Sequence, residues 1–494
     1  MTKTNLQINK SILIDWMPNR KSNIPIYSQI VGYFCNKVSC GDWVSGQSIP
    51  PQRHLSELFG VNRSTIVEAM DTLTSMGIIE SRFGGGTRIA NDSWSSLMSM
   101  KAPDWKNYLT AGVLRSNTPA VQIINHLEFT EGITRMSTGE LSPDLVQTGI
   151  IQKVMSNLSQ RKLNMNYPAP LGMPGLRTEI QKMLAKRGID VPISCILIVS
   201  GALQALQLIA GGITQSKSTV YIGMPSYLHS LNVFQSAGAT ISGVPLDEKG
   251  IQPWMIKNTQ TQKGHSLLYI IPTFQNPTGC VMPEERRREV LKYCTEHSMP
   301  IIEDDVFCDL WLDVPPPRPI RTMDKNGSVI YIGSLSKSFS PGLRLGWVVG
   351  PESVIERLAD IKMQTDYGVS ALTQQVTEEI MKEGLYDTGV QFIREHLRIR
   401  RDLMLVLLEK YFADIAEWQR PAGGFFIWVK LKHQVLAESV FKCALKEKML
   451  VPPGTIYGIQ YTSHLRLTYG YLAEDELKNS MIKLSKIIHG LLKQ

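Results

Sequence analysis

Apolar residues in the first ninety positions recur at the spacing of amphipathic helices. One helix is expected over residues 25–40, a shorter one over 53–59, and a third that ends at Gly77. Two short strands are expected next, at 78–80 and 87–90, joined by a basic, glycine-rich tip. Helix, turn, helix and hairpin in this order predict a winged helix-turn-helix.

The pattern changes after about residue 130, where near-continuous apolar, β-branched runs alternate with helical stretches. Strands that are apolar on both faces are typical of a buried, mostly parallel sheet covered by helices. This pattern predicts an α/β domain with its functional residues at the strand ends. The expected strands are 195–199, 219–222, 267–272, 300–303 and 329–332.

A stretch between the two patterns has no sustained period. Residues 91–118 are rich in polar side chains and are interpreted as a linker, partly helical near 104–109. A chain of 494 residues is also too long for one ordinary domain. We therefore expect a multidomain protein, with domains over residues 24–90 and 119–494.

Composition narrows the class of protein. An apolar fraction of 43% and a charged fraction of 19% are those of a folded, soluble protein. A net charge of +8 permits an anionic partner without proving one. The seven cysteines are scattered without a CxxC pair, which favours free thiols in a reducing cytoplasm and argues against a metal site. Neither a membrane span nor a secretory signal is expected, so we predict a cytoplasmic location.

The start of the third predicted helix carries polar residues that suit DNA. Arg63 can read guanine in a major groove, and the hydroxyls of Ser64 and Thr65 can bind phosphate. The glycine backbone of the hairpin tip can approach phosphates closely. The alternative is a small helical interaction module whose arginines are only solvated.

Four motifs make the DNA interpretation more specific: Ile-Pro-Ile-Tyr-Ser-Gln-Ile, Pro-Pro-Gln-Arg-His-Leu, Gly-Val-Asn-Arg-Ser-Thr-Ile-Val and Gly-Gly-Gly-Thr-Arg-Ile. Together they resemble the GntR family of DNA-binding domains across residues 24–90. Gln52 departs from the serine that is common in that family. The resemblance implies operator DNA as a partner, contacted by Arg53, Arg63, Ser64, Thr65 and Gly86.

The segment Ser-Leu-Ser-Lys-Ser-Phe-Ser-Pro-Gly-Leu-Arg-Leu-Gly-Trp, residues 334–347, carries the chemistry of the second domain. The amine of Lys337 can hold an aldehyde covalently, and Arg344 can clamp a phosphate beside it. Pyridoxal 5′-phosphate (PLP) is the natural ligand with both groups. Alone, Lys337 is more often a surface lysine.

Other segments can meet the remaining needs of that cofactor. The turn at 199–204 opens a predicted helix, whose free N–H groups suit a phosphate. Asp304 follows a strand and can keep the pyridine nitrogen protonated, Asn276 can donate to the phenolic oxygen, and Tyr227 can cover the ring. Each residue also has an ordinary interpretation, as a solvated strand end, a turn or a core residue.

The order and spacing of these residues resemble the fold-type I, class I aminotransferases over residues 125–490. The resemblance implies a PLP-dependent transferase fold with a smaller C-terminal α+β subdomain. It implies Lys337 as the Schiff-base lysine, Arg466 as the group that holds a carboxylate, and Gly139 as a backbone contact near it. The other cofactor contacts that it implies are Asp304, Asn276, Tyr227, Ser334, Arg344, the Ala202 and Leu203 amides, and Tyr167 acting across subunits.

Both halves in this order resemble the MocR subfamily of GntR regulators, over nearly the whole chain. The resemblance implies a homodimer arranged head to tail. Phe307 stands where aminotransferases usually carry a tyrosine, and it cannot donate to the phenolic oxygen. Leu203 also replaces a more usual polar residue, so efficient turnover is not expected. The prediction is a PLP-dependent transcriptional regulator that senses PLP or an amino compound as an aldimine at Lys337.

Two alternatives stay open. A working aminotransferase with an attached DNA-binding domain would turn over an amino acid rapidly and repeatedly. A constitutive DNA-binding protein with an empty cofactor pocket would be colourless. The effector, the operator and the sign of regulation are not readable, although His229 replaces the arginine of γ-aminobutyrate-sensing members.

Overall fold

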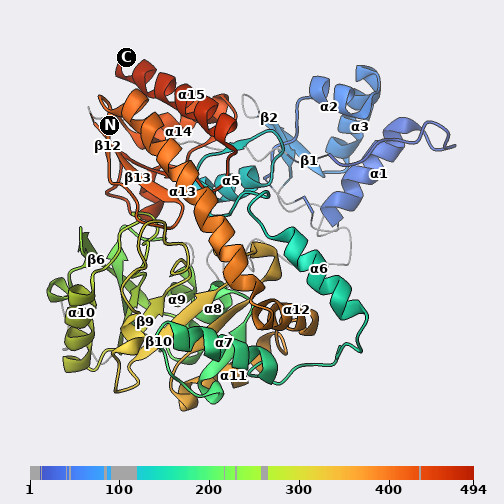
Figure 1. Ribbon diagram of the computed structural model, residues 1–494. Helices are drawn as coiled ribbons and strands as arrows, with labels where there is room; N and C mark the ends of the chain where they lie inside the picture. Colours follow the sequence, from blue (N-terminus) through green and yellow to red (C-terminus); the bar gives the residue numbers. More distant parts are fainter. Residues whose placement is uncertain are drawn as a thin grey trace. The chain divides into compact units, whose positions relative to one another are not determined.

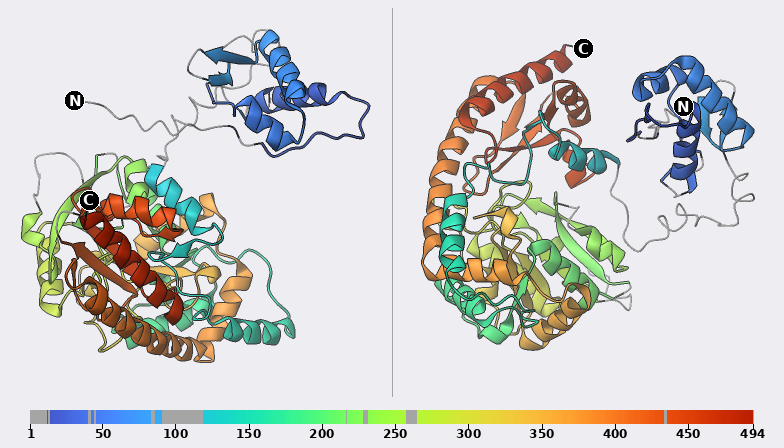
Figure 2. Two further views of the ribbon diagram at one scale, coloured as in Figure 1. Left: turned by 90° about the horizontal axis from the view of Figure 1, so that it is seen from above. Right: turned by 90° about the vertical axis from the view of Figure 1, so that its right-hand side faces the viewer.

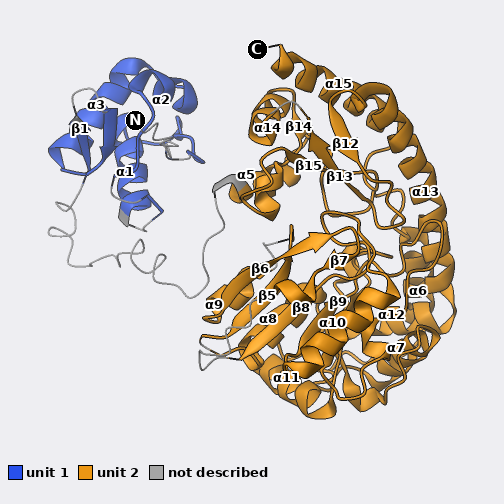
Figure 3. Ribbon diagram, turned by 90° about the vertical axis from the view of Figure 1, so that its left-hand side faces the viewer, with its two compact units in different colours: residues 1–113 blue, residues 114–494 orange. Residues whose placement is uncertain are grey.

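The computed structural model forms two compact units, residues 1–113 and 114–494 (Figure 3). Within them, it describes residues 12, 14–39, 42–43, 46–82, 86–90, 119–215, 217–227, 231–256, 265–432 and 435–493. The predicted linker 91–118, with its helix near 104–109, and His229 lie outside these residues.

The first unit has the predicted order of elements (Figure 1). Its described residues form α1 (Ile26–Ser39), α2 (Gln52–Phe59), α3 (Arg63–Ser75) and an antiparallel pair of strands, β1 (Ile79–Arg82) and β2 (Gly86–Ile89). The predicted winged helix-turn-helix is therefore confirmed.

The core of this unit explains why these helices form. Phe34, Leu55, Ile66 and Leu73 come from three different helices and are each at most 1% exposed. Gly77 has a φ of +68° and ends the third helix, as predicted, because a left-handed turn favours glycine. Asn62 is the N-cap residue of α3, and its side chain makes no capping hydrogen bond.

The described residues of the second unit contain an eight-stranded sheet. Its pairings are parallel except those of β11 with β10 and β4 and that of β6 with β7, so the predicted, mostly parallel sheet is confirmed. Every predicted strand is present. In spatial order the strands are β4 (Ile196–Val199), β11 (Gly346–Val349), β10 (Val329–Ser334), β9 (Ile301–Asp304), β8 (Ser266–Ile270), β5 (Thr219–Met224), β6 (Thr240–Asp247) and β7 (Gly250–Ile251).

Helices cover both faces of this sheet (Figure 1). Ile196 and Ile198 of β4 join one apolar cluster, whereas Leu197 and Val199 join another on the opposite face. Burial on both sides explains the continuous apolar runs of the sequence. The covering helices are α6 (Thr148–Ser159), α7 (Pro174–Lys186) and α12 (Ala371–Lys382) on the first cluster, and α8 (Ala202–Gly212), α9 (Asn232–Ser236) and α11 (Glu352–Thr365) on the second. The helix α10 (Glu284–Glu296) packs on the sheet through a third cluster, which includes Leu268 of β8 and Ile301 of β9.

The C-terminal subdomain is a second, antiparallel sheet with helices. Its strands are β12 (Ala416–Trp418), β13 (Phe426–Leu431) and β15 (His464–Thr468). Its helices are α13 (Leu385–Phe412), α14 (Ala437–Lys446) and α15 (Glu474–Leu492). Figure 2 shows α13 running along the outside of the second unit, from the large-sheet region to this subdomain. The predicted α+β subdomain is therefore confirmed.

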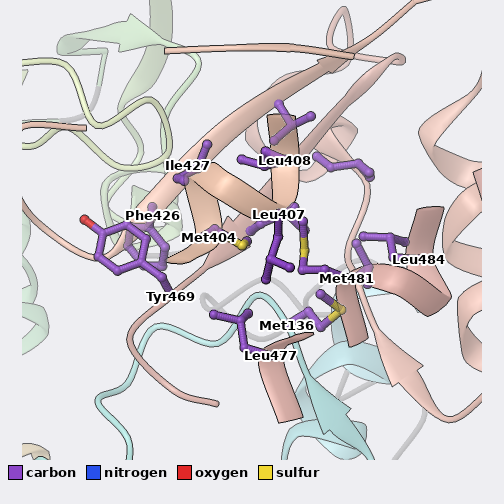
Figure 4. Packing of buried hydrophobic residues seen from close by; sticks show 14 of the residues in the cluster. Met136, Met404, Leu407, Leu408, Phe426, Ile427, Tyr469, Leu477, Met481 and Leu484 are labelled. Atoms are coloured by element: carbon purple, nitrogen blue, oxygen red, sulfur yellow. The ribbon is translucent and has the colours of Figure 1, made fainter. Parts of the chain in front are cut away.

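One apolar cluster holds the subdomain together. Met404 and Leu408 of α13 pack with Phe426 of β13 and Met481 of α15, as Figure 4 shows. Each of these side chains is at most 2% exposed. Truncation of a buried leucine or methionine in such a cluster costs about 2–5 kcal/mol, so the cluster is a major source of local stability.

A segment ahead of the large sheet joins this subdomain. After α5 (Pro119–Glu128), β3 (Thr134–Arg135) pairs in parallel with β14 (Met449–Leu450). The backbone N–H of Met136 continues the contact by donating to Leu450 O at 3.1 Å. This pairing brings α5 and the residues near 137–140 to the junction between the two sheets. The described residues also include 3-10 segments at Ile193–Cys195, Pro253–Met255, Ile320–Thr322, Pro341–Leu343 and Gly454–Tyr457.

Among the described residues, no helix is both long enough and apolar enough to cross a membrane.

Candidate functional site

A cavity of about 470 Å³ lies between the strand ends of the large sheet and the C-terminal subdomain. Its volume is within the usual range for small-molecule sites, about 300–1,000 Å³. All of the predicted cofactor and effector residues except Tyr167 line it. These are Gly139, Ala202, Leu203, Tyr227, Asn276, Asp304, Ser334, Lys337, Arg344 and Arg466.

Lys337 lies in the loop that follows β10. Its Nζ donates a hydrogen bond to Gly139 O at 2.6 Å, which aims the amine across the cavity. Enclosure by the protein, and secondarily the nearby Arg466 cation, lower the pKa of Lys337 to about 8. A neutral amine is the nucleophilic form, so the site makes this lysine far more reactive at neutral pH than a solvated one.

Asp304 ends the neighbouring strand β9 and is 6% exposed. Its Oδ2 accepts a hydrogen bond from the Tyr269 hydroxyl at 2.7 Å, whereas Oδ1 has no hydrogen-bond partner among the described residues. Burial raises the pKa of Asp304 to about 6. A buried carboxylate with one free oxygen suits a cationic N–H donor, such as a protonated pyridine nitrogen.

An anion cradle lies at the start of α8. Gly201 has a φ of +87°, and a Cβ at this position would meet Arg344 Nη2 at 3.0 Å, so the turn requires glycine. Arg344 donates to Ser200 O at 3.2 Å and to Ser336 Oγ at 3.4 Å. The guanidinium, the serine hydroxyls and the free amides of the helix start match the needs of a phosphate.

The opposite end of the cavity is built around Arg466 of β15. Its guanidinium carbon lies 4.0 Å from the ring centroid of Phe426 and 5.1 Å from that of Tyr457. Its Nη1 donates to Asn276 Oδ1 at 2.8 Å, and Nη2 donates to Ser137 O. Because the oxygen of the Asn276 side chain accepts from Arg466, its NH2 group remains available as a donor. This arrangement suits the predicted hydrogen bond to the phenolic oxygen of the cofactor.

Aromatic and apolar side chains form the remaining walls. Tyr227 is 38% exposed and its ring centroid lies 6.5 Å from that of Tyr457, while Leu203 also faces the cavity. Phe307 is buried and packs edge-on against Phe425 and Phe426. At the position where aminotransferases usually carry a tyrosine hydroxyl, this chain therefore has an apolar ring among other apolar rings.

Tyr167 lies away from the cavity of its own chain. It is 81% exposed, and its ring contacts that of Tyr367 at a centroid distance of 5.4 Å. Its predicted action on the other subunit's phosphate stays a prediction.

Sequence reasoning missed several residues that support the site. Tyr269 lies in a central strand, where a tyrosine gives no signal beyond its strand propensity. Gln204 accepts from Ser200 N at 2.7 Å and donates to Asp366 at 2.5 Å. These bonds connect the turn at 199–204 to the C-terminal end of α11. Ser336 is one of several serines in its segment, so only its contact with Arg344 singles it out.

The predicted DNA contacts lie at or near the beginning of α2, α3 and β2 in the first unit. Arg63, Ser64 and Thr65 form the first turn of α3, a turn that contains no acidic residue. Arg53 lies near the start of α2, and Gly86 begins β2 with a φ of +73°. All are exposed except Thr65, which is half-buried. Their role at DNA stays a prediction.

Comparison with known families matches both halves of the chain. Residues 26–89 match the bacterial regulatory proteins of the gntR family, and residues 131–483 match aminotransferase class I and II. The chain is a MocR-type member of the GntR family of transcriptional regulators. The family assignment confirms the expected cofactor, PLP, and the unpaired Asp304 oxygen and the cradle at Gly201 fit it.

Relatives share the whole arrangement of this MocR-type regulator. The uncharacterized HTH-type transcriptional regulator YisV of Bacillus subtilis is 44% identical over 95% of this chain and 97% of its own length. The HTH-type transcriptional regulator NorG of Staphylococcus aureus is 35% identical over 88% and 98%.

Solved aminotransferases share the second unit. The kynurenine aminotransferase of Pyrococcus horikoshii is 28% identical, with a TM-score of 0.73 over 79% of this chain and 99% of its own. LysN, an α-aminoadipate aminotransferase of Thermus thermophilus, is 25% identical, with a TM-score of 0.72 over the same shares.

The lowered pKa of Lys337 gives a direct chemical prediction. In cofactor-free protein, the rate of Lys337 acetylation by a trace of acetic anhydride should rise with pH up to about 8 and then level off. Solvated lysines in the same sample should keep gaining reactivity to beyond pH 10, because their pKa is about 10.4. Mass spectrometry of the peptides measures both. A Lys337 midpoint near 10 would contradict the effect of burial.

Proposed function

We propose that this regulator binds PLP at Lys337, senses an amino compound there, and changes its affinity for operator DNA in response. The observation that carries the proposal is that Lys337, Asp304, Arg344 and Arg466 line one cavity in a chain with a winged helix-turn-helix. We further propose that it acts in the cytoplasm as a head-to-tail homodimer.

Each proposed cofactor contact suits a different chemical group of PLP. When bound, PLP supplies a carbonyl carbon that condenses with an amine. Lys337 offers that amine, and Gly139 O holds it in place. Asp304 offers a buried negative charge for the ring nitrogen, and Arg344 offers a fixed positive charge for the phosphate.

The proposed effector contact is Arg466. Arg466 is 4% exposed and its guanidinium is held on an aromatic face, so it offers a preorganised site for a carboxylate. An amino carboxylate in this cavity can therefore place its carboxylate at Arg466 and its amine near Lys337. Such a ligand switches the protein only if it binds two conformations unequally.

Catalytic turnover is the second candidate function. It is favoured by Lys337, whose amine is readily neutral, and by Asp304 in the same cavity. It is disfavoured by the buried Phe307, which offers no hydroxyl to tune the cofactor. We therefore give sensing priority over turnover.

Exposed aromatic and apolar side chains support the proposed dimer. Met165, Tyr167 and Tyr367 are 64%, 81% and 57% exposed, although the two tyrosines contact each other. Large apolar groups that gather on a surface mark interaction sites. We propose that this patch contacts the second subunit and directs Tyr167 to its phosphate site.

Removing the amine tests the cofactor site. The Lys337→Ala variant should lose the visible absorbance of lysine-bound PLP, and borohydride treatment should attach no cofactor mass to the peptide that contains residue 337. The exposed Lys325 gives a matched control, since Lys325→Ala should keep both signals. Covalent attachment in the Lys337→Ala variant would rule out the assignment.

Removing one charge from α3 tests the DNA contacts. Arg63→Ala should weaken binding to the cognate promoter by about 1–3 kcal/mol, because it removes a base contact in the groove. Lys21→Ala, which removes an equal charge from an exposed position outside the helices, should change affinity much less. Fluorescence anisotropy with labelled promoter DNA measures both, and equal losses would contradict a specific role for Arg63.

A further inference from the structure

Two carboxylates in the cavity have no role in the proposed cofactor contacts. Glu128 is the last residue of α5, and Glu140 directly follows Gly139; both line the cavity and are half-buried. Within the described part of the chain, neither side chain has a hydrogen bond or an ion pair. The helix α5, which carries Glu128, was not predicted from the sequence. No role was predicted for Glu140, although its neighbour Gly139 was a predicted contact.

These carboxylates share one electrostatic environment with the effector end of the cavity. Burial raises the pKa of Glu128. The Arg466 cation lowers this pKa, and the Glu140 carboxylate raises it. Glu140 also acts on Lys337, where it opposes the effect of burial. Glu128 therefore lies within electrostatic range of both Arg466 and Lys337, and Glu140 within range of Lys337.

The charges that remain after cofactor binding decide which ligand fits. Lys337, Asp304 and Arg344 serve the cofactor, which leaves one cation, Arg466, and the two glutamates among the charged cavity residues described. An amino acid with an apolar side chain would satisfy Arg466 and leave both glutamates unpaired. An acidic side chain would meet them with like charge, which is unfavourable in a partly buried site.

We propose that Glu128 and Glu140 select an amino carboxylate with a second cationic group, an amine or a guanidinium, as the effector. The carboxylate binds Arg466, the reacting amine lies at Lys337, and the distal cation pairs with the glutamates. The inference rests on the proposed function, because it assumes that the cavity holds PLP and an amino compound together. The cavity itself is defined by buried cofactor residues, including the unpaired Oδ1 of Asp304, and does not depend on the glutamates.

Pairs of amino acids that differ only in the distal charge test this selection. Full-length protein loaded with PLP is titrated with lysine against norleucine and with arginine against citrulline, while its visible spectrum is recorded. We expect the charged member of each pair to change the spectrum at concentrations at least about tenfold lower, as a charge-assisted hydrogen bond provides.

Variants assign the preference to the glutamates. Glu128→Gln and Glu140→Gln should each weaken the response to lysine by about tenfold and leave the response to norleucine unaltered. Glu131→Gln is the matched control, because Glu131 is exposed and does not line the cavity. Glu128→Lys should turn the preference toward glutamate, an amino dicarboxylate. This reversal is a gain of response that a misfolded variant cannot produce.

The outcomes separate this inference from the proposed function. If the wild-type protein shows no lysine-bound PLP, the proposed function fails. If PLP is bound but no amino carboxylate changes the spectrum, the proposed sensing function fails as well. If PLP is bound and amino carboxylates act, but norleucine acts as well as lysine or the glutamine variants keep the full preference, the effector selection alone is wrong.

Discussion

The parallel pairing of β9 with β10 is the constraint on which the site depends. Asp304 lies opposite Ile332 in this pairing, and Lys337 follows five residues after Ile332. One register therefore places the carboxylate and the amine at the same edge of the sheet, inside protein rather than in water. A shift by one residue would turn Asp304 to the opposite face and separate the two groups.

Burial at that edge of the sheet shifts the pKa of both groups. It lowers the pKa of Lys337 and raises that of Asp304, each toward the neutral form. The Tyr269 hydroxyl and Gly139 O hold these groups without supplying the opposite charge that each lacks. The cavity is thus matched to a ligand that carries its own charges, a pyridinium at one end and a phosphate at the cradle of Arg344.

The sequence predicted most of this fold because its patterns follow directly from burial. Strands covered on both faces are continuously apolar, so β4, β5, β8, β9 and β10 were predicted, although β6, β7 and β11 were not. The last of these begins two residues after Arg344, inside the segment 334–347 that was interpreted for its cofactor chemistry. The cofactor segments were predicted because lysine, glycine and proline motifs are local. Tyr269 and Glu128 were missed because strand register and the β3–β14 contact, respectively, bring them to the cavity. Gln204 was missed because its contact with Asp366 joins segments that are far apart in the sequence.

The proposed function requires that ligand binding in the cavity and DNA binding by the first unit are coupled. Binding of an amino compound and binding of DNA must then affect one another by the same factor. The most direct test measures promoter affinity and the visible spectrum of the PLP-loaded full-length protein together, over one titration with an amino compound. We expect both signals to change with the same midpoint, and both changes to vanish in Lys337→Ala. A complete spectral change with unaltered promoter affinity would contradict the claim.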